Sequence, residues 1–144
     1  MKHKGAIMEY SKERMDDLMR AYDEYISSCD YIRMSEVYKI IVNMPSRRFW
    51  VSDIRAALII SAMIRGKTDL STMCPLKKEM YEEIYNRVFK LQEEYPELTI
   101  SELCAKVIAQ PAPKFYLTPG SAKVMVCKAR KQWIQEKWKR LRLL

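Results

Sequence analysis

The sequence is poor in the residues that build tight turns. Three glycines and six prolines occur in 144 residues, alongside ten methionines, and hydrophobic and charged residues make up 49% and 31%. Hairpins depend on glycine, whereas this composition favours helix, so an all-β barrel or sandwich is not expected. The length and hydrophobic content suffice for a modest core. We predict an all-α protein whose residues 1–144 form a single body.

Histidine and paired cysteines are also scarce. His3 is the only histidine, and no C-x-x-C motif joins any of the four cysteines: Cys29, Cys74, Cys104 and Cys127. No ordinary Cys/His zinc site can be assembled, a catalytic triad would have to use His3, and no phosphate-binding glycine loop is present. We expect a non-enzymatic protein without cofactor or metal. One metal-binding alternative stays open, in carboxylates such as Asp16, Asp17, Glu82 and Glu83.

Long apolar runs are absent too. No stretch of 18 or more apolar residues exists, and residues 1–7 lack a long apolar segment. We therefore expect neither a membrane span nor a secretory signal, and a cytoplasmic protein.

What the sequence has in excess is positive charge near its C-terminal end. The formal net charge is +8, and residues 123–144 contain eight basic residues and one acidic residue. Residues 1–122 contain 18 basic and 17 acidic residues and are nearly neutral. Such asymmetry indicates an anionic partner.

The sequence also predicts a tandem duplication with an offset of 66 residues. When residues 12–67 are aligned with the residues 66 positions later, seven positions are identical. Identity alone therefore does not distinguish a duplication from a chance similarity. The conservative matches cluster where residues 45–52 align with residues 111–118, and this clustering favours duplication. The predicted organisation is repeat unit one at 9–67, a linker at 68–75, repeat unit two at 76–131 and a basic helical extension at 132–144.

Each repeat is predicted to contain three helices and one extended connector. Apolar spacing predicts first helices at 9–28 and 76–95 and second helices at 34–44 and about 100–110. Thr99 and Glu102 form a capping box, and Pro45 and Pro111 end the second helices. Ser52 and Thr118 are predicted to cap the third helices, the latter followed by Pro119.

The connectors 49–51 and 115–117 are β-prone, and they could pair with each other. In one interpretation Phe49 and Phe115 fill the core between helices two and three of their repeats. In the other, the connectors expose a basic and aromatic edge that stacks on bases or binds phosphates. That edge would comprise Arg47, Arg48, Trp50, Lys114 and Tyr116.

The two third helices differ. Residues 54–64 are apolar on nearly all sides, which predicts a helix buried on most sides. The third helix of the second copy is predicted to run from about Pro119 to the end of the chain. One face of it carries a mainly basic stripe: Lys128, Lys131, Gln135, Lys139 and Arg142. Further basic residues flank it: Lys123, Arg130, Lys137 and Arg140. The opposite side is expected to pack on the body: Val126, Cys127, Trp133, Ile134, Trp138 and Leu141.

Three interpretations of this basic helix are open: a solvated face, a phosphate-binding surface, or a surface for a membrane or an acidic protein. We favour DNA as the partner, keep an acidic protein partner as the alternative, and leave the oligomeric state undetermined. The candidate nucleic-acid-binding residues are Arg47, Arg48, Lys114, Lys123, Lys128, Arg130, Lys131, Lys139 and Arg142.

Two resemblances bear on this hypothesis. Residues 100–108 resemble the first helix of a helix-turn-helix motif, although about nine residues, rather than three or four, precede the next helix. Residues 44–52 and 111–123 resemble short uncharacterised proteins of prophages and other mobile elements of anaerobic gut bacteria. This second resemblance covers about residues 9–131 and implies genomic context only, which favours a regulator or accessory factor of a mobile element.

Overall fold

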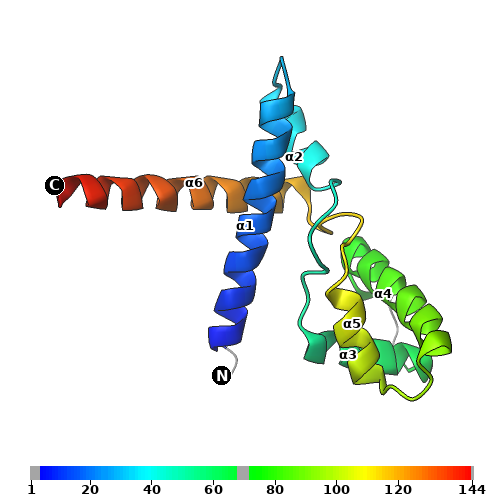
Figure 1. Ribbon diagram of the computed structural model, residues 1–144. Coiled ribbons are helices and arrows are strands. Elements are labelled where there is room, and N and C mark those ends of the chain that lie inside the picture. Colours follow the sequence, from blue (N-terminus) through cyan, green and yellow to red (C-terminus); the bar gives the residue numbers. More distant parts are fainter. Residues whose placement is uncertain (1–3, 68–71, 144) are drawn as a thin grey trace. The chain divides into compact units, whose positions relative to one another are not determined.

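In the part of the chain that the structure describes, residues 4–67 and 72–143 of a computed structural model, the regular elements are helices joined by non-helical connectors. The prediction of an all-α protein is therefore confirmed. The helices, shown in Figure 1, are α1 (Lys4–Ser28), α2 (Met34–Ile41), α3 (Asp53–Ile64), α4 (Pro75–Glu94), α5 (Ile100–Ile108) and α6 (Pro119–Arg142). His3 and residues 68–71 of the predicted linker lie outside the described residues.

The predicted helix ends agree with the structure to within a few residues. The largest difference is at α1, which begins at Lys4 rather than at residue 9. Helix α2 ends at Ile41, short of the predicted residue 44, because the backbone tightens ahead of Pro45. The amide of Asn43 donates to the carbonyl of Ile40 at 3.1 Å, a shorter-range bond than the α-helical one.

Hydroxyl side chains cap three helices, as the sequence predicts. The Ser52 hydroxyl accepts from the amide of Arg55, and the Thr118 hydroxyl accepts from the amide of Ser121, each at 3.1 Å. Thr99 accepts from the amide of Glu102 at 3.2 Å. Each cap satisfies an amide that has no partner within its own helix, so the starts of α3, α5 and α6 are fixed locally.

We expect Thr99→Ala to lower the free energy of unfolding by about 1 kcal/mol, because the start of α5 loses its cap. Urea denaturation followed by circular dichroism measures this change. Ser101→Ala is the matched control, since Ser101 lies in the same helix and is exposed. Equal midpoints for the two variants would show that the cap contributes nothing.

The helices form two compact units that cross the predicted repeat boundaries. The terminal unit consists of residues Met1–Met44 and Leu117–Leu144, and the central unit of Pro45–Tyr116. In the terminal unit α6 packs against α1 and α2; in the central unit α3 packs against α4 and α5. Each third helix therefore packs with the first two helices of the other predicted repeat.

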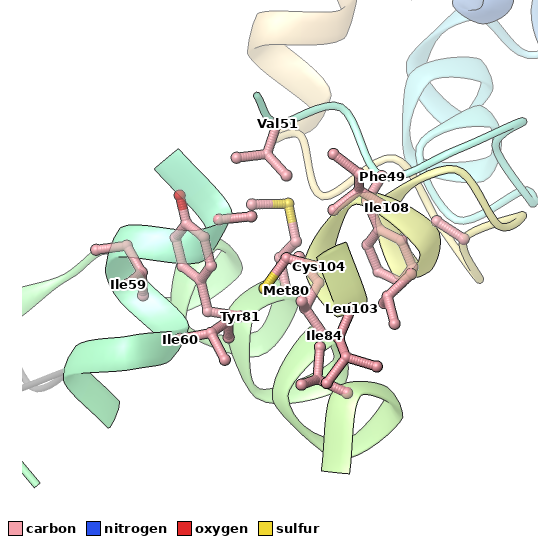
Figure 2. Packing of buried hydrophobic residues seen from close by; sticks show 14 residues of the cluster. Phe49, Val51, Ile59, Ile60, Met80, Tyr81, Ile84, Leu103, Cys104 and Ile108 are labelled. Atoms are coloured by element: carbon pink, nitrogen blue, oxygen red, sulfur yellow. The ribbon is translucent and has the colours of Figure 1, made fainter. Parts of the chain in front are cut away.

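The core of the central unit surrounds Phe49, which is fully buried. Figure 2 shows Phe49 with residues of all three helices of this unit, including Ile60 of α3, Ile84 of α4 and Leu103 of α5. The ring of Phe49 stacks on that of Tyr116, with centroids 6.0 Å apart. Phe49 is therefore a core residue, as one interpretation predicts, but its core is built from α3, α4 and α5, whereas α2 belongs to the other unit.

The two connectors meet at one antiparallel bridge. Ser46 and Ala112 exchange both amide-to-carbonyl hydrogen bonds, each at 3.0 Å. The Ser46 hydroxyl, which is buried, also donates to the carbonyl of Arg48 at 2.8 Å. The connectors therefore pair as the sequence suggests, but three residues before the aromatic triplets where pairing was expected.

Helix α3 is less buried than its sequence predicts. Its core side carries Ala56, Ile59 and Ile60, whereas Ile54 and Leu58 are 68% and 59% exposed. The prediction of a helix buried on most sides is therefore wrong. Apolar residues on all sides allow a helix to be buried on every side. In this structure, however, α4 and α5 cover only one side of α3.

Burial makes one cysteine unreactive. The Cys104 side chain lies in the central core, and this burial raises the pKa of its thiol to about 11. At pH 8 the thiol therefore stays protonated, and the thiolate is the species that reacts. We expect iodoacetamide to label the exposed Cys74 and Cys127 first, with Cys104 labelled only after denaturation, as mapped by mass spectrometry. Rapid labelling of Cys104 in the folded protein would contradict this burial.

The core of the terminal unit is formed where α6 meets α1 and α2. Its buried apolar residues are Leu18, Ala21, Val37, Tyr38, Ile41, Val42, Ala122 and Val126. The rings of Tyr22 and Tyr38 stack at a centroid distance of 6.4 Å. Asp17 is fully buried and forms an ion pair with Arg20 at 2.7 Å, so its charge is compensated inside the unit.

Candidate nucleic-acid interface

The first half of α6 is anchored in the terminal unit. Thr118 and Pro119 start the helix, and no helix-breaking residue occurs after Gly120. Ala122 and Val126, one turn apart, are fully buried. Arg130 donates from Nη1 to the hydroxyl of Tyr22 on α1 at 3.5 Å. These contacts hold the root of the helix and fix the direction of its distal half.

The second half of α6 stands in solvent. Every residue from Arg130 to Leu143 is exposed. Figure 1 shows this half, in orange and red, extending well beyond its crossing with α1. A helix of 24 residues is about 36 Å long, and the buried residues of α6 occupy only its beginning. The distal half thus offers its whole circumference to a partner.

All the basic residues predicted as ligand-binding on α6 are exposed: Lys123, Lys128, Arg130, Lys131, Lys139 and Arg142. Lys137 and Arg140, which flank the predicted stripe, are exposed as well. Positions separated by three or four residues lie on one helix face, so Lys128, Lys131 and Lys139 line the same side. The structure therefore brings most of the predicted cations together on one solvent-exposed helix.

The expected packing of the opposite side is wrong in its distal part. Val126 is buried as predicted, but Cys127 is exposed, and the exposed set includes Trp133 (61%), Ile134, Trp138 (60%) and Leu141. The apolar spacing of the sequence predicts a packing face, yet α6 extends past the part that α1 and α2 bury. Two tryptophans therefore belong to the exposed surface, where only cations were expected.

The connector residues form a second, smaller basic surface on the central unit. Arg47 is exposed, whereas Arg48 and Lys114 are half-buried. The Arg48 guanidinium donates to the carbonyls of Phe49 (3.0 Å) and Val51 (2.9 Å), and Lys114 pairs with Glu79 at 2.5 Å. Two of these three cations thus hold the connectors in place.

The aromatic members of the predicted exposed edge are partly covered as well. Trp50 is half-buried beneath the guanidinium of Arg48, which lies 5.1 Å from the ring centroid. Tyr116 is half-buried, and burial raises the pKa of its hydroxyl to about 12. Its φ of 56° lies in the left-handed region, a backbone conformation that residues other than glycine rarely adopt. The connectors therefore serve mainly to build the fold.

The two helices of the helix-turn-helix resemblance belong to different units. Helix α5 lies in the central unit and α6 in the terminal unit. The connecting segment runs from the end of α5 at Ile108 to the start of α6 at Pro119. DNA recognition of the helix-turn-helix kind therefore gains no support from this fold.

Two other kinds of site are absent from the described part of the chain. It holds no group of three histidine, cysteine, aspartate or glutamate side chains placed to bind a metal ion. None of its helices combines the length and hydrophobicity needed to cross a lipid bilayer. The metal-binding alternative based on Asp17 in particular is not supported, because this carboxylate pairs with Arg20.

Comparisons with models of protein families, with curated proteins and with solved structures find no match to this chain.

Proposed function

We propose that the protein binds nucleic acid through the exposed half of α6 and has no catalytic role. The observation that carries the proposal is the set of exposed cations along α6 from Lys128 onward, of which Lys128, Lys131 and Lys139 lie on one face. Residues 123–144 hold eight basic residues and one acidic residue, so the local field attracts a polyanion. A helix that projects from its unit can approach a phosphate backbone without obstruction by the rest of that unit.

Lysine and arginine side chains bind nucleic acid chiefly by neutralising phosphates and releasing counterions. In this proposal Lys128, Lys131, Lys139 and Arg142 contact phosphates, with Lys123 and Arg130 nearer the root of the helix. Arg47 is the best placed of the connector residues for a secondary contact, because it is exposed. Arg48 and Lys114 would have to exchange their present bonds for phosphate oxygens.

Fluorescence anisotropy tests the proposal directly. A labelled 20-nucleotide DNA of random sequence, as a single strand and as a duplex, is titrated with the protein at 50, 100 and 200 mM salt. We expect dissociation constants in the micromolar range at low salt for at least one form, and affinity that falls steeply as salt rises. Absence of binding to both forms at 50 mM salt would overturn the proposal.

A second function is favoured by one observation, the exposure of Trp133, Ile134, Trp138 and Leu141 beside the cations. Aromatic residues with arginine are typical of protein interfaces, so α6 could bind an acidic protein. A partner captured through α6, together with no affinity for oligonucleotides, would support this function. The role in a mobile element, as a regulator or accessory factor, rests on the sequence resemblance and stays part of the proposal.

We also propose that the chain is a tandem duplication with an offset of 66 residues. Helices α1 and α4 end 66 residues apart, and the starts of α2 and α5 and of α3 and α6 are separated by the same offset. The bridge joins Ser46 to Ala112, which are again equivalent positions. Superposition should then place α1, α2 and the start of α6 on α4, α5 and α3. Different helix crossings in the two units would contradict the duplication.

A further inference from the structure

We propose that the nucleic acid bound by α6 is single-stranded, with Trp133 and Trp138 stacking on unpaired bases. This inference rests on the proposed function and names its ligand class. Both indoles are well exposed, at 61% and 60%, although tryptophan is highly buried on average. An exposed aromatic ring among cations is the arrangement by which proteins hold single strands.

Cations lie close to both indoles. The ammonium of Lys137 is 5.0 Å from the ring centroid of Trp133. Lys139 and Arg142 are exposed one residue and four residues after Trp138. A base stacked on either indole would therefore have its own phosphate, or that of a neighbouring nucleotide, within reach of a basic side chain. Stacking supplies contacts to the bases, and the cations supply contacts to the backbone.

The placement of the two indoles favours a flexible ligand. Five residues separate them, which corresponds to about 7.5 Å along the helix and about 140° around it. A rigid duplex lies against one side of a helix, and its bases are stacked on each other, so it has no free base face for either indole. A single strand can wind around the exposed half of α6 and reach both rings. Cations are likewise found on more than one side of the helix, because Arg130, Lys137 and Arg140 lie away from the stripe that contains Lys131.

Three ligands of equal length separate the contributions: a single-stranded 20-mer, its duplex, and an abasic strand that keeps the phosphates and lacks the bases. We expect the single strand to bind about tenfold or more tightly than the abasic strand, and more tightly than the duplex. Tryptophan fluorescence should be quenched on binding the single strand. Trp133→Leu with Trp138→Leu should lower affinity for the single strand about tenfold or more and leave affinity for the abasic strand unchanged.

Phe89→Leu is the matched control, because Phe89 is an exposed aromatic residue on α4 of the central unit, outside the proposed binding surface, and its replacement should leave the affinity for the single strand unchanged. Circular dichroism confirms that each variant is folded. Equal affinity for the single and abasic strands, or no effect of the double variant, would overturn the inference while the proposed function stands. Absence of binding to all three ligands would overturn both. Binding to vesicles of anionic lipid without binding to any strand would also overturn both, and would assign the indoles to a membrane surface.

Discussion

Replacing Phe49 by alanine is expected to lower the free energy of unfolding of the central unit by about 3–5 kcal/mol. Phe49 is fully buried, and its ring stacks on that of Tyr116. The guanidinium carbon of Arg87 lies 4.9 Å from the centroid of the Phe49 ring. Removal of this ring leaves a cavity in the core beside Ile108 of α5 and deprives Arg87 of α4 of its aromatic contact. Chemical denaturation followed by circular dichroism measures the loss.

Phe89→Ala is the matched control for this prediction. Phe89 lies on α4 in the same unit but is 57% exposed, so its truncation removes little buried surface. We expect its effect to stay within about 1 kcal/mol. Similar losses for the two variants would show that Phe49 is not the centre of the core.

Reversing three charges on α6 is expected to abolish nucleic-acid binding at moderate salt. Lys128→Glu with Lys131→Glu and Lys139→Glu removes three phosphate contacts and adds three repulsive charges, so we expect affinity to fall by about 100-fold or more. The three side chains are exposed, so the fold should be retained. Anisotropy with the 20-nucleotide DNA at 100 mM salt measures the change.

The control for this variant has the same net charge. Lys77, Lys78 and Lys90 are exposed on α4 in the central unit, and changing all three to glutamate alters the total charge equally. We expect this variant to keep most of its affinity for DNA, because the three lysines that it replaces lie outside α6. If both triple variants lose affinity equally, binding depends on overall charge and α6 is not the binding surface.

The features that could be predicted from the sequence are those determined by neighbouring residues. Thr99 and Glu102 predict the start of α5, and Thr118 with Pro119 predicts the start of α6, because capping depends on residues within one helical turn. One of the two interpretations of the aromatic connectors places Phe49 in the core.

The features that could not be predicted depend on which surfaces meet. The spacing of Trp133 and Trp138 predicts an apolar side of α6, but it does not reveal how far α1 and α2 extend along that helix. For the same reason Ile54 and Leu58 are exposed although their helix is apolar all around. The repeat pattern likewise does not indicate that α3 packs with α4 and α5. The sequence of the connector from Pro45 to Ser52 does not show which unit the following helix, α3, joins.

The central claim, that α6 neutralises phosphates, is tested most directly by the salt dependence of binding. The logarithm of the observed binding constant is plotted against the logarithm of salt concentration for the protein and for Lys128→Gln with Lys131→Gln. Each phosphate contact contributes a slope of about 0.9 on duplex DNA and about 0.7 on single strands. We predict that the double variant loses about 1.4–1.8 from the slope. Equal slopes for the two proteins would contradict the claim, because these lysines would then contact no phosphate.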